Sequence, residues 1–291
     1  MGWQLTKDHM YIKKIHHFIP VLPCFPSAEA EHDLATLVNM SNIGLLLMYF
    51  KILIPSASSH KMTHFEISIV SDTVCPWCYI GLRNLQAAIA QRTAKSPTDT
   101  FSLTWDPFQL NPQAPRGQTV DKRASYEKKL GVDGARTVFE RLTSAGETAG
   151  IQFSFDGRTG NTLDSHRLLE LARKISDVSE ATSGQATHSQ ADLQTRLAEE
   201  LFADYFERER DITDHEVLKK AALRAGLDER GIDILAFLAS DDLVDLVQRE
   251  ASAQREEGIN GVPHFTINDD ILASVREVGE KTTSSALSSL T

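Results

Sequence analysis

The 291-residue sequence has few cysteines and no excess of positive charge, and each shortage excludes a class of protein. Three cysteines are too few for the disulfide framework of a small secreted domain. Lys and Arg number 30 against 40 Asp and Glu, which gives a formal net charge of −10. Because nonspecific nucleic-acid binding needs a positive excess, this composition argues against a nucleic-acid partner.

The sequence also lacks an apolar run long enough to cross a bilayer. The best candidate, residues 43–54, has 12 positions interrupted by Lys51, whereas a transmembrane helix needs about 20. This run lies too far from the N-terminus for a secretory signal peptide and lacks a small-residue cleavage site. We therefore predict no membrane span and a cytoplasmic location, with organelle targeting by the N-terminal segment as the alternative.

Residues 1–61 differ from the rest of the chain in charge and in pattern. They contain five Lys and four Asp or Glu, so the negative charge of the protein falls on residues 62–291. Most of the segment shows neither a helical nor a strand period, which argues against packed elements. We predict a poorly ordered extension at 1–61 and one domain at 62–291.

A strand followed by a helix is predicted at the start of this domain. Residues 65–70 alternate and then run apolar, as in a short buried strand, and apolar residues from Tyr79 onward have helical spacing. A second strand is predicted at 101–105, and strand character returns only at 261–268. Between about 116 and 257 the pattern indicates helix after helix. The sequence therefore predicts an α/β fold with a long helical insertion.

Two kinds of feature divide this helical region. Gly131, Gly150, Gly226 and Gly258 lie where helices are expected to end. Residues 176–190 are rich in Ser, Thr, Ala and Gln, which favours an exposed loop.

Cys75 and Cys78 form a Cys-Pro-Trp-Cys motif directly after the first strand. At a helix N-terminus, free N–H groups and the helix dipole favour a thiolate at Cys75. Pro76 suits the first turn, where its missing N–H costs nothing. Cys78, one turn later, can attack a mixed disulfide on Cys75 and release the product. We expect Cys75 to be the more exposed thiol, with Cys78 buried behind it and Trp77 exposed between them.

A zinc site is the main alternative for such a cysteine pair. Structural zinc takes four ligands, and the chain has no second Cys-x-x-Cys pair. Cys24 and an unrelated histidine would have to complete the site by chance. The sequence thus favours redox chemistry, and we predict no metal.

Five short blocks of the sequence carry a family resemblance. These blocks are residues 72–81, 107–112, 161–168, 201–206 and 258–265. In this order they resemble the DsbA-like thioredoxin family, and within it the FrnE-like branch. That branch is related to 2-hydroxychromene-2-carboxylate isomerase and to kappa-class glutathione transferase. The resemblance covers about 63–268.

The resemblance implies a thioredoxin fold with a large all-helical insertion domain. It also implies that Val262–Pro263 is a cis peptide against the cysteines, where it would offer backbone groups to an extended substrate. The alternative is that Pro263 merely begins an edge strand. Asn111 and His166 would contact the substrate, although a turn residue before Pro112 and a histidine on a helix surface or between domains are the alternatives.

These features predict an enzyme, a thiol–disulfide oxidoreductase that reduces, forms or isomerises disulfides of a protein or a small thiol. The predicted catalytic residues are Cys75, Cys78 and Pro263. The predicted substrate-binding residues are Pro76, Trp77, Val262, Asn111 and His166. The resemblance implies no tightly bound cofactor and leaves glutathione as a candidate co-substrate. The alternatives are a glutathione-dependent isomerase or transferase acting on a small aromatic or polyketide-like molecule, and a non-catalytic binding module.

The C-terminal end departs from the family pattern. The family closes with a strand, a turn and a helix, but residues 277–282 only half resemble that turn. Residues 270–276 fit the strand poorly. We therefore expect the final strand and helix to be malformed or shortened.

Overall fold

The computed structural model describes most of the chain after residue 61. The described ranges are 62–183, 193–227, 231–268 and 270–273. They all fall within one compact unit, His60–Thr291, whereas the predicted extension at 1–61 lies outside them. No helix in these ranges combines the length and the apolar character that a bilayer span requires.

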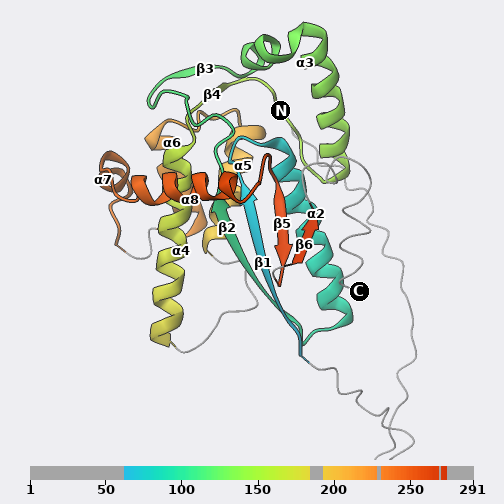
Figure 1. The fold of residues 1–291 in the computed structure, drawn as a ribbon, viewed down its shortest axis with the longest axis vertical. Coiled ribbons are helices and arrows are strands. Elements are labelled where there is room, and N and C mark those ends of the chain that lie inside the picture. Colours follow the sequence, from blue (N-terminus) through green and yellow to red (C-terminus); the bar gives the residue numbers. More distant parts are fainter. Residues whose placement is uncertain (1–61, 184–192, 228–230, 269, 274–291) are drawn as a thin grey trace, which may run out of the picture. The chain divides into compact units, whose positions relative to one another are not determined.

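A four-stranded sheet with the order β2-β1-β5-β6 lies at the centre of this unit (Figure 1). Its strands are β1 (His64–Ser71), β2 (Thr100–Pro107), β5 (His264–Ile267) and β6 (Asp270–Ala273). β1 and β2 are parallel, so they need a crossover, and α2 (Pro76–Lys95) supplies it. β5 is antiparallel to both neighbours. The register pairs Val70 with His264, which places the segment before β5 beside the loop that follows β1.

The sheet and α2 are held together by close packing around Gly81. A Cβ atom on Gly81 would lie 2.9 Å from the ring of Phe265 and 3.5 Å from Cγ of Pro263. Leu82 and Leu85 on the same helix are completely or almost completely buried. The apolar run that follows the cysteine pair therefore packs α2 against the sheet, as its spacing predicts.

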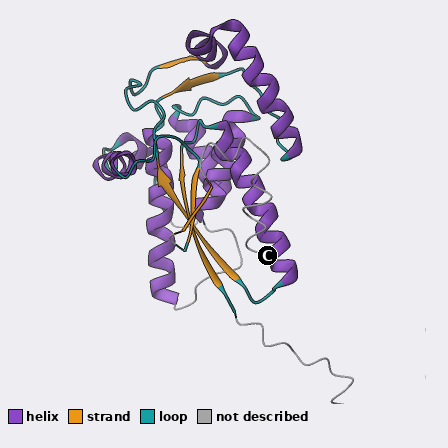
Figure 2. Cartoon of the chain, turned by 45° about the vertical axis from the view of Figure 1, so that its right-hand side comes forward, coloured by secondary structure: helices purple, strands orange, loops and turns teal. Residues whose placement is uncertain are grey.

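Between β2 and β5 the chain is mainly helical. The helices are α3 (Lys122–Thr148), α4 (Leu163–Ser183), α5 (Leu193–Phe206), α6 (His215–Ala225), α7 (Ile234–Ala239) and α8 (Val244–Glu256). Two three-residue strands, β3 (Thr119–Asp121) and β4 (Arg158–Gly160), pair antiparallel within this region (Figure 2). The prediction of an all-helical insertion is therefore wrong in this detail, because strands this short show no measurable apolar period.

One expected helix boundary is confirmed, whereas two others differ from the structure. Gly226 ends α6 in the left-handed conformation with a φ of 92°, as predicted. Gly131, with a φ of 73°, instead kinks α3 without ending it. α4 continues to Ser183, into the stretch at 176–190 that was predicted as a loop. Composition is a weak guide there, because Ser and Thr are acceptable within a helix that packs well.

An aromatic cluster fixes α2 to α5. The ring of Tyr79 lies 5.3 Å from that of Phe202 and 6.1 Å from that of Phe206, measured between centroids. The Tyr79 hydroxyl also donates a hydrogen bond to Glu207. Tyr205 and Phe206 belong to the same core, since both are buried. The helix that begins at the cysteine pair is thus anchored to the insertion.

A buried lysine anchors the start of α3. Asp121 caps this helix by accepting the N–H of Ala124 at 2.7 Å. Lys122 is 1% exposed, and its Nζ donates to the Tyr205 carbonyl at 2.6 Å. The same Nζ lies 3.9 Å from the centroid of the Tyr205 ring. Burial lowers the pKa of Lys122 from 10.5 to about 8.

The end of the described chain contains a strand where the sequence fits the family pattern poorly. β6 covers Asp270–Ala273 and pairs with β5 through a register shift between Phe265 and Thr266. Residues 274–291 lie outside the described residues, so the shortened final helix stays a prediction.

Candidate active site

The cysteine pair lies at the start of α2, as the sequence predicts. Cys75 is the N-cap residue in an extended conformation, with φ −93° and ψ 114°, and Pro76 occupies the first turn. The Asp72 carbonyl accepts the N–H of Cys75 at 3.0 Å, and the Cys75 carbonyl accepts the N–H of Cys78 at 3.1 Å. The first turn of α2, which the structure describes in full, contains no acidic residue. This geometry favours negative charge on the Cys75 sulfur.

Both thiols are free and buried, with exposed fractions of 4% for Cys75 and 1% for Cys78. Cys75 is the more exposed of the two thiols, as expected, but the difference is small. Its Sγ donates to the carbonyl of Val262 at 3.4 Å. Residues remote in the sequence thus cover Cys75, and a local pattern cannot indicate such cover. Cys24, the third cysteine, lies outside the described residues.

Val262, whose carbonyl contacts Cys75, is joined to Pro263 by a cis peptide bond. Both residues are buried. The structure therefore brings together the two sequence blocks that carry most of the family resemblance, the one around Cys75 and the one before β5. Pro76 is also buried, so it has less access to a substrate than the sequence analysis assumed.

The two cysteines have different electrostatic surroundings. Burial raises the pKa of Cys78 well above its usual range, and the neighbouring Cys75 acts in the same direction. Hydrogen bonds from the Ser71 side chain and the Asp72 backbone oppose this shift. Cys78 therefore stays protonated near neutral pH, and a protonated thiol is a poor nucleophile.

His166 lies behind the site, where it holds two loops together. It is 3% exposed, and its Nε2 lies 3.1 Å from the Phe108 carbonyl and 3.3 Å from Oδ1 of Asp72. Because the Phe108 carbonyl can only accept, Nε2 must carry a proton. The other oxygen of Asp72 accepts the N–H of Leu110 at 2.7 Å. The predicted substrate contact of His166 does not fit this position, because a helix pattern does not reveal which neighbours its buried face meets.

Arg167, the neighbour of His166, is a structural residue of the insertion. Its guanidinium is completely buried and donates to Asp164 Oδ1 at 2.7 Å. It also donates to backbone carbonyls at and just beyond the C-terminal end of α7. These carbonyls belong to Phe237, Leu238, Ser240 and Asp242. Arg167 therefore caps α7 and joins it to α4.

A cavity of about 380 Å³ opens beside Val74, the residue before Cys75. Asn111 is exposed and lies on its wall, and its carbonyl accepts the N–H of Ala114 at 3.1 Å. Both interpretations of Asn111 therefore fit, since it is a turn residue that also faces the cavity. The other lining residues are mainly polar and include Gln113, Gln118, Lys129, Thr159 and Thr162.

Tyr126 on α3 is a cavity residue that sequence reasoning missed. Its ring is half-buried and lies 5.1 Å from that of Phe139. Burial and the nearby charge of Cys75 raise the pKa of Tyr126 to about 12. Its hydroxyl therefore stays protonated and can donate a hydrogen bond into the cavity. Helical periodicity placed this tyrosine on a helix but gave no sign that it faces the cysteines.

Trp77 is half-buried, not fully exposed as predicted. Its ring packs against the hydrophobic core on one side. The guanidinium carbon of Arg141, on α3, lies 5.2 Å from the centroid of the ring. An arginine of the insertion thus contacts the residue between the two cysteines, which no sequence pattern indicated.

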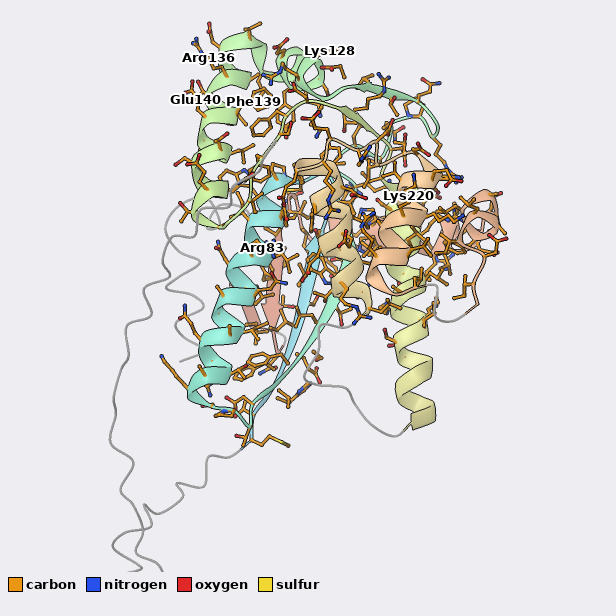
Figure 3. All side chains as sticks on the ribbon, turned by 180° about the vertical axis from the view of Figure 1, so that it is seen from behind. Arg83, Lys128, Arg136, Phe139, Glu140 and Lys220 are labelled. Carbon is orange, nitrogen blue, oxygen red and sulfur yellow. The ribbon has the colours of Figure 1, made fainter. Side chains whose placement is uncertain are left out.

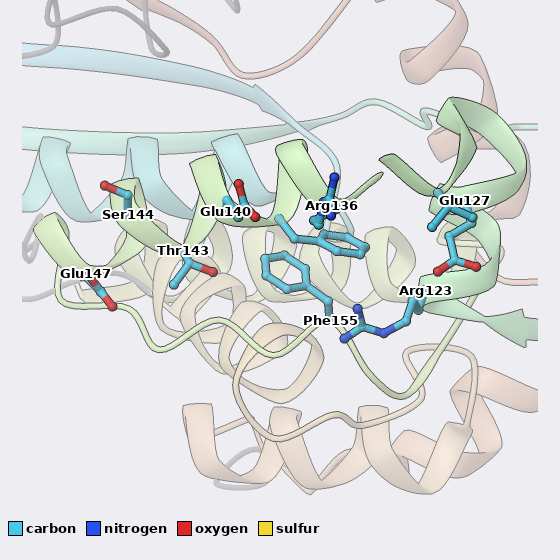
Figure 4. Close-up of a pocket in the computed structure, with 10 residues that line it drawn as sticks. Arg123, Glu127, Arg136, Glu140, Thr143, Ser144, Glu147 and Phe155 are labelled. Atoms are coloured by element: carbon cyan, nitrogen blue, oxygen red, sulfur yellow. The ribbon is translucent and has the colours of Figure 1, made fainter. Parts of the chain in front are cut away.

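A second cavity, of about 590 Å³, lies along α3 (Figure 4). Its lining includes the rings of Phe139 and Phe155 with charged residues around them, among them Arg123 and Arg136. Figure 3 shows Arg136 and Phe139 on the same helix. None of the predicted site residues lines this cavity.

The comparisons with known proteins concern the part of the chain that follows the N-terminal segment. A family model described as a DsbA-like thioredoxin domain matches residues 66–280. The chain is 26% identical over 221 residues to YwbO of Bacillus subtilis, a protein described as uncharacterized. That alignment covers 74% of this chain and 94% of YwbO.

Among solved structures, the chain is similar to SCO1869 of Streptomyces coelicolor, described as a "probable DsbA oxidoreductase". The TM-score is 0.60 and the identity is 24%. The match covers 77% of this chain and 91% of that one. At this level of identity the likeness concerns the fold alone.

Proposed function

We propose that this chain, which belongs to the family of DsbA-like thioredoxin domains, uses Cys75 and Cys78 as a redox-active pair in thiol–disulfide exchange. The family supports a disulfide oxidoreductase or isomerase in general terms. The observation that carries the finer proposal is the contact of Cys75 Sγ with the carbonyl of Val262, directly before cis-Pro263. This contact supports the proposal, because the free thiol lies at a helix N-terminus and the neighbouring segment would receive an extended peptide.

Cys75 would be the nucleophile. Its thiolate attacks one sulfur of a substrate disulfide, so a new S–S bond forms while the substrate S–S bond breaks. The second substrate sulfur leaves as a thiolate and takes up a proton. The N-terminus of α2 favours the attacking charge on Cys75, because the helix dipole is positive at that end.

Cys78 would complete the exchange. It attacks the Cys75 sulfur of the mixed disulfide, the Cys75–Cys78 disulfide forms, and the remaining substrate sulfur leaves as a thiol. In the mixed disulfide Cys75 carries no charge, so one cause of the raised Cys78 pKa is then absent. The substrate gains two electrons and the cysteine pair loses two. An external thiol must return them for another turnover, and the reverse sequence forms a disulfide.

Val262 and Pro263 would hold the substrate segment that carries the disulfide. In the free dithiol, the Val262 carbonyl accepts a hydrogen bond from the Cys75 thiol. Once Cys75 is in a mixed disulfide, this carbonyl is available to accept an N–H group from an extended substrate. Pro263 has no N–H of its own and leaves that side to the substrate.

The cavity beside Val74 suits either a polypeptide segment or a small thiol. Leu110 and Val120 on its lining are 48% and 55% exposed, which would favour an apolar polypeptide. Asn111 and Lys129 offer polar and charged groups to a small acidic thiol such as glutathione. We propose a cytoplasmic location for this chemistry, where a reducing poise would keep the pair mainly as a dithiol.

The second candidate function is a glutathione-dependent isomerase or transferase acting on a small aromatic or polyketide-like molecule. The observation that favours it is the cavity of about 380 Å³, since its volume lies within the usual range for small-ligand sites. The presence of Cys78 directly behind Cys75 favours redox turnover instead.

The variant Cys78→Ser separates these two functions. A redox enzyme should lose turnover and accumulate mixed disulfides on Cys75, detectable by mass spectrometry under nonreducing conditions. A glutathione-dependent isomerase should keep most of its activity, because its chemistry needs no resolving thiol. Cys75→Ser is the matched control and should form no adduct. If Cys78→Ser keeps full disulfide-reducing turnover, the proposed role of the pair is wrong.

A further inference from the structure

We propose that Arg141 is a positioning residue for the cysteine pair and acts through Trp77, an inference that rests on the proposed function. The guanidinium carbon lies 5.2 Å from the centroid of the Trp77 ring. This separation is within the range of a cation–π contact. Trp77 stands between Cys75 and Cys78 in the sequence, so this arginine–tryptophan contact joins the insertion to the redox motif.

The backbone of α3 holds Arg141 firmly in this place. Residues three and four positions apart share one face of a helix, so Val138, Arg141 and Ala145 lie together. Val138 and Ala145 pack against the hydrophobic core, and Leu142 is fully buried. On the adjoining face, the ring of Phe139 lies 4.3 Å from that of Phe155. The helix therefore cannot shift away from α2 without exposing core residues.

The contact restrains a side chain that would otherwise have freedom to turn. Trp77 is half-buried, with one part of its ring on the core and the rest toward solvent. A guanidinium over the ring opposes rotation of the indole away from α2. The orientation of the indole determines the shape of the surface that a substrate meets beside Cys75. Arg141 thus controls access to the attacking sulfur without contacting it.

The same contact places a guanidinium, which is a cation, over the ring that separates the two cysteines in the motif. Trp77 itself carries no charge. A cation beside the pair favours the thiolate and hence the dithiol state over the disulfide state. Loss of Arg141 should therefore shift the exchange equilibrium toward the disulfide as well as slow the reaction.

The decisive experiment compares Arg141→Met with Arg123→Met. Arg123 is a matched control, because its guanidinium carbon lies 5.1 Å from the centroid of the Phe139 ring on the same helix, in a contact that does not involve the cysteine motif. Three quantities are measured in each variant: kcat and KM for disulfide reduction, the dithiol–disulfide equilibrium in a glutathione buffer, and the Trp77 emission. The emission of Trp77→Phe gives the contribution of the other tryptophans, which is subtracted.

We expect Arg141→Met to lower kcat/KM and to shift the equilibrium, each by about two- to fivefold, and to change the Trp77 emission. Arg123→Met should leave all three within about twofold of wild type. Arg141→Lys should recover most of the equilibrium, because it keeps the charge. In a Trp77→Phe background, Arg141→Met should still shift the dithiol–disulfide equilibrium, which depends on charge. It should no longer lower kcat, which depends on the orientation of Trp77.

Equal effects of Arg141→Met and Arg123→Met would overturn the proposal, as would full additivity of Arg141→Met and Trp77→Phe on kcat. If Arg141→Met does not fold, Arg141→Gln decides the question, because glutamine has a polar side chain of similar reach but no charge: an unchanged Trp77 emission together with an unchanged kcat/KM contradicts the positioning role. Failure of the proposed function would appear separately, as disulfide reduction that persists in Cys75→Ser. The equilibrium and the emission still test the contact in that case.

Discussion

The sheet region and the insertion contribute to the site in different ways. The sheet region holds the reacting sulfur through its backbone, because Cys75 is fixed by a turn after β1 and by the carbonyl of Val262. The insertion contributes side chains, such as Tyr126 on the cavity wall and Arg141 over Trp77. In a site of this kind, one region fixes the position of the cysteine sulfur and the other supplies the side chains around it. The walls can change while the geometry of the sulfur atoms stays the same.

The largest effect should come from the sheet region. Cys75→Ser should abolish disulfide reduction, because a hydroxyl is a far weaker nucleophile than a thiolate near neutral pH. The measurement is the rate at which a protein disulfide is reduced in the presence of a dithiol. Turnover within about tenfold of wild type would show that another group attacks the substrate.

The next effect concerns the insertion and its dependence on pH. Between pH 8 and 10.5 the unfolded chain binds more protons at Lys122 than the folded chain does. The free energy of unfolding should therefore rise over this interval, with a contribution of roughly 3 kcal/mol from Lys122. Tyr126 acts in the opposite direction above pH 10, because its raised pKa makes the folded chain bind more protons there.

Urea unfolding between pH 7.5 and 10 tests this contribution. Lys122→Met should remove most of the rise, since methionine fills a similar volume without a charge. Lys220→Met, at an exposed lysine on α6, is the control and should leave the pH dependence unchanged. If the free energy of unfolding still rises with pH in Lys122→Met, other groups cause the rise.

A smaller effect on stability should come from His166, which joins the insertion to the sheet region. His166→Leu should lower the free energy of unfolding by roughly 1–3 kcal/mol, because it removes the hydrogen bond to the buried Phe108 carbonyl and the contact with Oδ1 of the buried Asp72. The half-exposed pair of His215 with Asp164 provides the control, and His215→Leu should cost less than about 1 kcal/mol. A raised KM for His166→Leu with unchanged stability would restore His166 as a substrate contact.

The smallest effect should come from the cavity wall. Tyr126→Phe should lower kcat/KM for a small disulfide such as oxidised glutathione by about two- to tenfold, through the loss of one hydrogen bond. Stability should change by less than about 0.5 kcal/mol, since the ring stays in place against Phe139. An unchanged kcat/KM would mean that the hydroxyl does not meet the substrate.

Local sequence patterns were sufficient for the parts of the site that depend on neighbouring residues. The strand before Cys75 and the helix that begins at Pro76 follow from period and capping chemistry, and the structure confirms both. The predicted thioredoxin fold is likewise confirmed by the family match, and the insertion is helical apart from the two short strands β3 and β4. The position of Val262 beside Cys75 depended on the family resemblance, because nothing local connects two residues so far apart.

Features that depend on packing between distant elements were not predictable in this way. Tyr126 and Arg141 reach the site from either side of the kink at Gly131, and the sequence indicates only a glycine at that point. His166 was placed on a helix correctly, but the face that it presents to Asp72 is decided by tertiary packing. The burial of Cys75 has the same origin.

The missing side chain at residue 81 lets α2 lie close to the segment that contains Pro263 and Phe265. A Cβ atom there would stand 2.9 Å from the Phe265 ring, so even alanine would act as a wedge under α2. Since α2 carries Cys75 and the segment before β5 carries Val262, such a wedge would separate the thiol from the carbonyl that it now touches. One absent methyl group thus helps to keep Cys75 within reach of the Val262 carbonyl.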